Sequence, residues 1–205
     1  MSTGLVFRSE RLDFLSPLEE HDEELFQVFT DPKTMLPHLQ MLYEGMTREN
    51  FRQRREMHRN DWKEGASFFL DIKLRSSGKV IGTTGHRAFF HSGCIEQARM
   101  CSLKSEIAEW GIIIGKLWQR QGFCKESFDS LIYYTRNPAT INEKDIDCEI
   151  YSPPEGCMKN INKILATTLQ DNTAMVAFLE MAGFQREIDD NDELNAWQKW
   201  TLSMT

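Results

Sequence analysis

The stretch EIAEWGIIIGKLWQRQGFCKE, residues 106–126, decides the fold. Its first part, Glu106 to Ile114, ends in three consecutive isoleucines, as expected for a strand that is buried on both faces. A turn that contains glycine follows, and helical spacing then extends from about Gly122 to Tyr134. The stretch therefore predicts a buried strand, a short loop and a helix that begins on that loop.

The loop between this strand and this helix has the properties of an anion site. The first N–H groups of a helix have no partner within the helix, and the helix dipole makes that end positive. Gly122 has no side chain that would block a phosphate from the backbone, while Arg120 and Lys125 add positive charge. The alternative is that the loop only connects the strand to the helix, because glycine is common in strand–helix turns that bind no ligand. The two cations, the small residue Cys124 and a later helix that begins at Asn172 favour the anion site.

The segments on either side alternate between strand and helix signals. In chain order we expect a strand over Leu5–Leu15, helices over Leu18–Phe29 and from Thr47 to about Lys63, strands over Phe68–Leu74 and Lys79–His86, the strand and helix already described, a strand over Ile164–Leu169, a helix from Asp171 to Ala182, and a final hairpin of Phe184–Ile188 with Ala196–Met204. Residues 33–46, 90–104 and 136–160 show no clear periodicity, apart from a short strand at 147–151. This order predicts an α/β fold with a mixed central sheet flanked by helices.

Length and composition limit the class of protein. The chain has 205 residues, of which 40% are hydrophobic, and this is enough for one domain over residues 1–205. A net charge of −7 argues against binding nucleic acid, and no apolar run approaches the roughly 20 residues that cross a bilayer. The five cysteines form no CxxC pair and the five histidines are scattered, which argues against a disulfide framework and a metal site. We therefore expect a cytoplasmic protein with neither a nucleic-acid nor a membrane partner.

The loop motif resembles that of the GNAT superfamily of acyl-CoA-dependent N-acetyltransferases. The family signature for the cofactor diphosphate is Gln/Arg-x-x-Gly-x-Gly/Ala, often with a Glu two residues later. Gln119, Gly122 and Glu126 match this signature, and Cys124 stands in place of the small residue.

Two further segments carry the same resemblance. Asn172-Thr173-Ala174-Met175 and Leu179-Glu180-Met181-Ala182-Gly183-Phe184 resemble the family pattern Asn-x-x-Ser…Leu-Glu-Lys-x-Gly-Phe. The opening Phe7-Arg8-Ser9-Glu10-Arg11-Leu12 resembles the first strand of the subgroup of ribosomal-protein-alanine acetyltransferases. The likeness covers nearly the whole chain in the right order, with an insertion near residues 136–160.

The resemblance implies a GNAT acyl-CoA N-acyltransferase fold with a splayed strand pair and acetyl-CoA as the acyl donor. The strand at 106–114 would bulge and separate from the strand at 163–169, and the pantetheine arm of the cofactor would fill the gap. Backbone N–H groups of Ile112, Ile113 and Ile114 would contact this arm and stabilise the oxyanion. Asn172 would hydrogen-bond the arm, and Phe178 would pack near it. The diphosphate would lie on the loop residues Gln119, Arg120, Gln121, Gly122, Phe123, Cys124 and Lys125.

Acetyl transfer to an amine needs a base, because an alkylammonium has a pKa of about 10. Glu109 lies where many relatives carry a Glu, and we expect it to be this base; the alternative is a solvated or salt-bridged strand carboxylate. Glu106 faces the other side of the sheet at strand spacing. The positions at which relatives carry a Tyr or Ser acid hold Leu179 and Met175, which leaves water, Tyr133 or Tyr134 to protonate the thiolate.

The acceptor is expected to be a primary amine, either a protein N-terminus or a small molecule. It would enter opposite the cofactor, between residues 33–60 and the final hairpin. Six apolar residues of this region form either a wall of the acceptor site or part of the hydrophobic core: Met35, Leu36, Leu39, Met41, Leu42 and Tyr43.

Three questions stay open in the sequence. The competing function is a non-catalytic acetyl-CoA-binding or scaffolding domain of the same fold, and a homodimer is compatible with either function. The arginines of residues 48–59 form a solvated helix face or attract an acidic substrate. Cys124 is a packing residue or a thiol whose pKa is lowered by the helix N-terminus.

Overall fold

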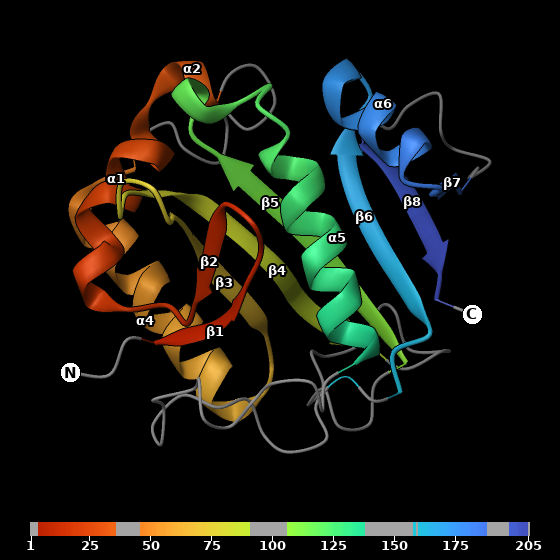
Figure 1. The fold of residues 1–205 in the computed structure, drawn as a ribbon, viewed down its shortest axis with the longest axis horizontal. Coiled ribbons are helices and arrows are strands. Elements are labelled where there is room, and N and C mark those ends of the chain that lie inside the picture. The colour runs from red at the N-terminus through yellow and green to blue at the C-terminus, as the bar shows by residue number, and fades with distance from the viewer. Residues whose placement is uncertain are drawn as a thin grey trace.

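The structure is a computed structural model that describes residues 4–35, 46–90, 106–137, 158, 160–187 and 197–204. Its strands form one eight-stranded sheet in the order β1-β2-β3-β4-β5-β6-β8-β7 (Figure 1). The strands are β1 (Leu5–Arg8), β2 (Leu12–Leu15), β3 (Phe68–Leu74), β4 (Val80–Phe90), β5 (Ile107–Ile114), β6 (Lys163–Leu169), β7 (Gln185–Arg186) and β8 (Trp197–Ser203). Neighbouring strands are antiparallel, except that β5 and β6 are parallel. The mixed sheet predicted from the sequence is therefore confirmed.

The helices in the described part of the chain are η1 (Glu19–His21), α1 (Asp22–Thr30), α2 (Pro32–Met35), α4 (Arg48–Glu64), η3 (Lys116–Trp118), α5 (Phe123–Arg136) and α6 (Thr173–Met181). Thr47 starts α4 as expected, since its hydroxyl accepts a hydrogen bond from the Asn50 N–H at 3.1 Å. None of these helices combines the length and the apolar character needed to cross a membrane.

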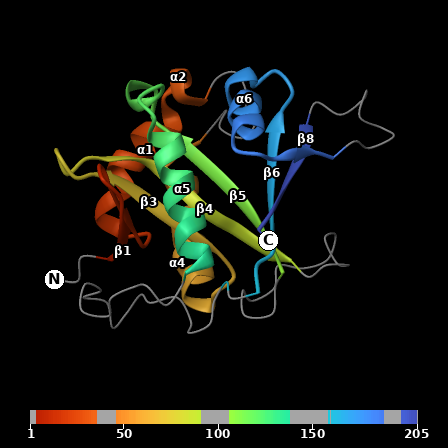
Figure 2. The ribbon, with the colours of Figure 1, turned by 45° about the vertical axis from the view of Figure 1, so that its right-hand side comes forward.

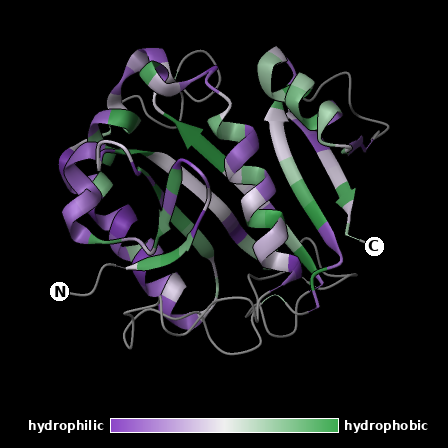
Figure 3. Cartoon of the chain, viewed as in Figure 1, coloured by the Kyte–Doolittle hydropathy of each residue, from purple (hydrophilic) through white to green (hydrophobic). Residues whose placement is uncertain are grey.

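The two faces of the sheet are covered by different helices. On one face, Trp110 of β5 packs against Phe128 of α5 and Phe178 of α6, with ring centroids 4.9 and 5.6 Å apart. On the other face, Ile113 of β5 packs with the core formed by α1, α2 and α4. In Figure 3 the upper half of β5 is strongly hydrophobic and α4 is largely hydrophilic. Helices therefore cover both faces of the isoleucine run as its sequence predicts, although only Ile114 is buried and Ile112 and Ile113 are half-buried.

Two expectations for the N-terminal third are wrong. Residues 5–15 form a hairpin of two strands, β1 and β2, instead of one strand. Its turn is closed by Ser9, whose N–H donates to the Leu12 carbonyl at 2.9 Å and whose hydroxyl accepts from the Leu12 N–H at 3.2 Å. The short helix α2 occupies the start of the segment expected to be irregular.

Several predictions fall outside the described residues. They are the short strand at 147–151, most of the insertion near 136–160, the loop after residue 90 and the turn of the final hairpin. The two strands of that hairpin, β7 and β8, do pair as expected.

Candidate active site

The predicted splayed strand pair is present at the centre of the sheet. β5 and β6 are in parallel register from Ile107 and Lys163 to Trp110 and Ala166, and their ladder ends there. Beyond this point the strands diverge, as Figure 2 shows. The expectation of a bulge in residues 106–114 is wrong, because the bulge between these two strands lies in the partner strand β4. There Arg87 is an extra residue between two successive β4–β5 pairs.

The register of β4 and β5 determines which backbone groups of β5 face the gap. Gly115 donates its N–H to the Ile81 carbonyl at 2.8 Å. Since antiparallel ladders alternate, the amide of Ile113 points toward β4, and those of Ile112 and Ile114 point toward β6. The side chain of Gln119 donates to the Ile114 carbonyl at 2.9 Å. The N–H groups of Ile112 and Ile114 are thus directed to the open side of β5.

The loop after β5 turns sharply onto the N-terminus of α5. Gly122 is in the left-handed region with φ +84°, and Arg120 has φ +61°. The first helical hydrogen bond runs from the Glu126 N–H to the Gly122 carbonyl at 3.1 Å, so the N–H groups before Glu126 precede the helical ladder. A Cβ on Gly122 would lie 3.3 Å from Nη2 of Arg11, which makes this a narrow cradle that a side chain would partly fill.

A clasp from the β1–β2 turn holds this loop. Ser9 donates its hydroxyl to Oε1 of Glu126 at 2.6 Å, and Arg11 donates Nε to Oε2 at 2.7 Å. Burial opposes ionisation of Glu126, but the hydrogen bonds from Ser9 and Arg11 outweigh it and lower the pKa of this carboxyl. Glu126 therefore ties two segments together that lie more than a hundred residues apart. The loop motif pointed to Glu126, but nothing in the sequence indicated Arg11 as its partner.

The predicted loop cations differ in what they are free to bind. Arg120 is exposed and has no partner among the described residues. Lys125 pairs with Asp129, one helical turn away, at 2.5 Å. Of the two interpretations of Cys124, the packing residue is the one that the structure supports. Cys124 packs against the core, and burial raises the pKa of its thiol to about 12, so the alternative of a lowered pKa is wrong.

The second predicted cofactor segment begins α6. Asn172 accepts a hydrogen bond from the Met175 N–H at 3.2 Å, so its side-chain oxygen serves as a helix cap. The Phe178 ring packs against both Trp110 and Phe128, with centroid distances of 5.6 Å to each. Leu179, where relatives carry a Tyr, is fully buried.

Glu109 lies at the end of the β5–β6 ladder, on the sheet face opposite α5. Its Oε1 accepts a hydrogen bond from Nη2 of Arg87, the bulged residue of β4, and another from the Thr167 hydroxyl of β6 at 3.5 Å. The Arg87 side chain passes beside Gly111, two residues on, where an added Cβ would make an ordinary contact at 3.5 Å with Cδ of Arg87. The Glu109 side chain keeps 16% of its surface exposed. The carboxylate is thus salt-bridged and accessible, and both sequence interpretations of it retain support.

The tyrosines named as proton donors lie elsewhere. Tyr134 is buried, and its ring is stacked between Phe7 and Phe68 with centroid distances of 4.8 and 5.2 Å. Tyr133 is 62% exposed. Both lie near the C-terminal end of α5, about 15 Å along the helix from the loop. The structure does not bring either tyrosine to the predicted cofactor loop.

The acceptor side is described only in part. Met35 is buried with Leu25, Val28 and Phe29 and is therefore core; the other five predicted wall residues, Leu36 to Tyr43, lie outside the described residues. In the described ranges, no three His, Cys, Asp or Glu side chains are grouped in a way that could hold a metal ion.

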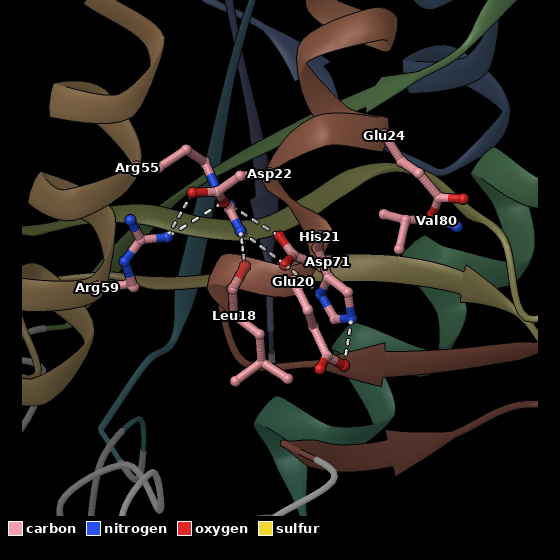
Figure 4. Close-up of polar contacts among 9 residues, drawn as sticks. All are labelled: Leu18, Glu20, His21, Asp22, Glu24, Arg55, Arg59, Asp71 and Val80. Carbon is pink, nitrogen blue, oxygen red and sulfur yellow. Dashed lines mark hydrogen bonds and ion pairs between the residues drawn. The ribbon is translucent and has the colours of Figure 1, made fainter. Parts of the chain in front are cut away.

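The arginine-rich helix is only partly a solvated face. Arg55 is 2% exposed and donates to both oxygens of Asp71 at 2.9 and 2.7 Å and to Asp22 at 2.6 Å (Figure 4). Burial opposes its charge, but the two aspartates outweigh burial and raise the pKa of the Arg55 guanidinium. His21 completes this cluster through Nδ1, which lies 2.8 Å from Asp71. The interpretation as a solvated side chain is therefore wrong for Arg55. The sequence of the helix alone could not reveal that Asp71, on β3, is its partner.

Known proteins agree with this geometry. The sequence profile of the family described as "Acetyltransferase (GNAT) domain" matches residues 14–185. The chain belongs to the GNAT acetyltransferase family. Membership identifies it as an acetyltransferase domain with acetyl-CoA as the acyl donor, and the cradle at Gly122 fits the diphosphate of such a cofactor. No curated protein matches the sequence.

Solved GNAT structures share the fold at low sequence identity. RimL, a ribosomal L7/L12 α-N-protein acetyltransferase in complex with coenzyme A, has a TM-score of 0.70 and 15% identity, with 97% of each chain covered. A GNAT-family acetyltransferase from Bacillus anthracis has a TM-score of 0.65 and 14% identity, covering 96% of this chain and 97% of that one. The microcin C7 self-immunity acetyltransferase MccE, in complex with acetyl-CoA and AMP, has a TM-score of 0.64 and 14% identity, covering 98% and 97%.

Proposed function

We propose that the protein transfers an acetyl group from acetyl-CoA to a primary amine by direct attack within a ternary complex. The observation that carries this proposal is the pairing of a splayed β5–β6 gap with a glycine cradle at the start of α5. The diphosphate would lie on the N–H groups at this helix start, with Arg120 beside it, a cation that pairs with none of the described residues. The pantetheine arm would follow the free edge of β5.

The two open N–H groups of β5 would act on the thioester. Those of Ile112 and Ile114 face the gap, and a thioester carbonyl within their reach would gain an oxyanion stabiliser. Ile113 would contribute by packing, because its amide is directed to β4. Asn172, the cap of α6, and Phe178, within α6, would lie along the other side of the cofactor arm.

Glu109 would accept the proton of the acceptor amine, directly or through water. The amine nitrogen forms its bond to the carbonyl carbon, the carbon–sulfur bond breaks, and the thiolate takes a proton from water, since Met175 and Leu179 carry no acid. In this account the acceptor approaches the face that holds Glu109 and Arg87, opposite α5. A cationic amine there would compete with Arg87 for the carboxylate.

Two classes of acceptor amine are to be tested, protein N-termini and small amines. The similarity of the fold to RimL motivates peptide acceptors, and free amino acids, polyamines and amino sugars form the second group to test. The single domain over residues 1–205, the cytoplasmic location and the homodimer stay predictions.

Release of free thiol from acetyl-CoA in the presence of these amines tests the proposal. Turnover with at least one amine is expected. Glu109→Gln should lower kcat by about 10²–10⁴-fold and leave the affinity for acetyl-CoA unchanged, whereas the matched variant Glu106→Gln should retain activity. Tight acetyl-CoA binding without turnover on any amine would favour the non-catalytic domain, and full activity of Glu109→Gln would remove Glu109 as the base.

A further inference from the structure

We propose that Arg11, in the turn between β1 and β2, is a binding residue for the diphosphate of the acyl donor. The inference rests on the proposed role of the 119–126 loop and adds a residue that lies more than a hundred positions away in the sequence. It concerns the cofactor side only and is independent of the base and the acceptor.

Arg11 is fixed against the loop from several directions. Its backbone N–H and its Nε donate to the two oxygens of Glu126 at 2.8 and 2.7 Å, and Nη1 donates to the Gln121 carbonyl at 3.0 Å. The guanidinium carbon also lies 4.4 Å from the centre of the Phe123 ring, in a cation–π contact. An arginine held in this way loses little further conformational entropy when it binds a ligand.

The remaining guanidinium nitrogen faces the cradle. Nη2 has no partner in the part of the chain that the structure describes, and it lies 3.3 Å from the position that a Cβ on Gly122 would take. Gly122 is also the cap of α5, so Nη2 is next to the N–H groups that begin this helix. The two N–H donors of Nη2 and the helix start can therefore converge on one anion.

The clasp with Glu126 explains why Arg11 stays in this position. The carboxylate uses its oxygens for Ser9 and for the backbone and Nε of Arg11, and leaves Nη2 unoccupied. Arg120, in contrast, is exposed and has no partner within the described ranges that would hold its guanidinium in place, and Lys125 is paired with Asp129. Among the described residues around this loop, Arg11 is thus a cation that is held in one orientation and still has a donor to offer.

Calorimetric titration of coenzyme A, 3′-dephospho-coenzyme A and pantetheine tests this role. Arg11→Gln should weaken both coenzymes by about 10- to 100-fold, because a charge-assisted hydrogen bond is lost, and should leave pantetheine unchanged. The affinity of the variant should also depend less on salt than that of the wild type. Arg11→Lys keeps the positive charge but lacks the planar guanidinium, so its affinity for coenzyme A should lie between those of the wild type and Arg11→Gln.

The matched control is Arg75→Gln. Arg75 donates Nη1 to the carbonyls of Ser9 and Glu10 in the same turn at 3.0 and 2.9 Å, so its loss loosens the turn without removing a donor from the cradle. Coenzyme A affinity close to wild type is expected for Arg75→Gln. Equal weakening by Arg11→Gln and Arg75→Gln, with pantetheine affected as well, would show a structural clasp and overturn the inference.

The outcomes also separate this inference from the proposed function. Wild-type affinity in Arg11→Gln, together with loss of binding in Gly122→Glu, would overturn the role of Arg11 and leave the loop assignment intact. A wild-type protein that binds no coenzyme A would overturn both.

Discussion

Two clusters of charged side chains, one around Asp71 and one around Glu126, use their hydrogen-bonding groups differently. In the Asp71 cluster, all three guanidinium nitrogens of Arg55 donate to acceptors within the protein, and the cluster is buried (Figure 4). In the Glu126 cluster, one nitrogen of Arg11 has no partner among the residues that the structure describes, and that nitrogen faces a glycine. Ionic contacts alone therefore do not distinguish structure from function. What differs between the two arginines is the donor that Arg11 leaves unused and the side to which it points.

The largest effect is expected from breaking the buried cluster. Asp71→Ala leaves the buried charge of Arg55 with only part of its compensation and should lower the free energy of unfolding by about 3–5 kcal/mol. Chemical denaturation followed by circular dichroism measures this change. The matched control is Asp129→Ala, which removes one partner of an exposed pair and should leave stability unchanged. A similar small change in both variants would contradict the structural role of the Asp71 cluster.

The next largest effect is the pH dependence of stability that arises from His86, which is buried. His86 is fully buried, its Nε2 lies 2.8 Å from the Thr135 hydroxyl, and burial lowers its pKa from 6.5 to about 3. The unfolded chain therefore binds a proton below pH 6.5 that the folded protein does not bind. Stability should fall by about 2 kcal/mol between pH 6.5 and about pH 5 on this account alone. His86→Gln should lack this part of the pH dependence, and an unchanged slope in denaturation curves of the variant would contradict it.

The smallest of the three effects is expected at the Glu126 clasp. Glu126→Gln replaces a carboxylate that accepts from Ser9 and Arg11 and should cost about 1–2 kcal/mol of stability, less than the loss of Asp71. Because Arg11 is then held less firmly, coenzyme A affinity should fall as well. A loss of stability without any change in coenzyme A affinity would separate the clasp from the binding site.

The sequence predicts the centre of the fold well because its signals there are local. The run of isoleucines, the glycine turn and the helical spacing after Gly122 lie within about twenty residues, and the structure places β5, the loop and α5 as expected. The hairpin of β1 and β2 was missed because its turn carries no glycine or proline. A continuous strand has nearly the same hydrophobic pattern.

The errors in the site come from contacts between distant segments. In the sequence, Arg55 is one of several arginines that are expected to be solvated. Its ion pair with Asp71 of β3 is visible only in the structure. In the same way, Arg11 becomes part of the loop only through Glu126, and the bulge at Arg87 depends on the register between β4 and β5. Local patterns cannot report such pairings, since the charge of a side chain does not reveal its partner.

Titration of coenzyme A into the wild type, Gly122→Ala and Gly122→Glu measures whether the loop before α5 binds the cofactor. Both variants strain a left-handed position and place a Cβ near Arg11, but only Glu adds a carboxylate to the cradle. We expect measurable binding to the wild type, weakened binding to Gly122→Ala and no measurable binding to Gly122→Glu. Equal affinity of the Ala and Glu variants would contradict the claim that the loop after the isoleucine strand holds the diphosphate.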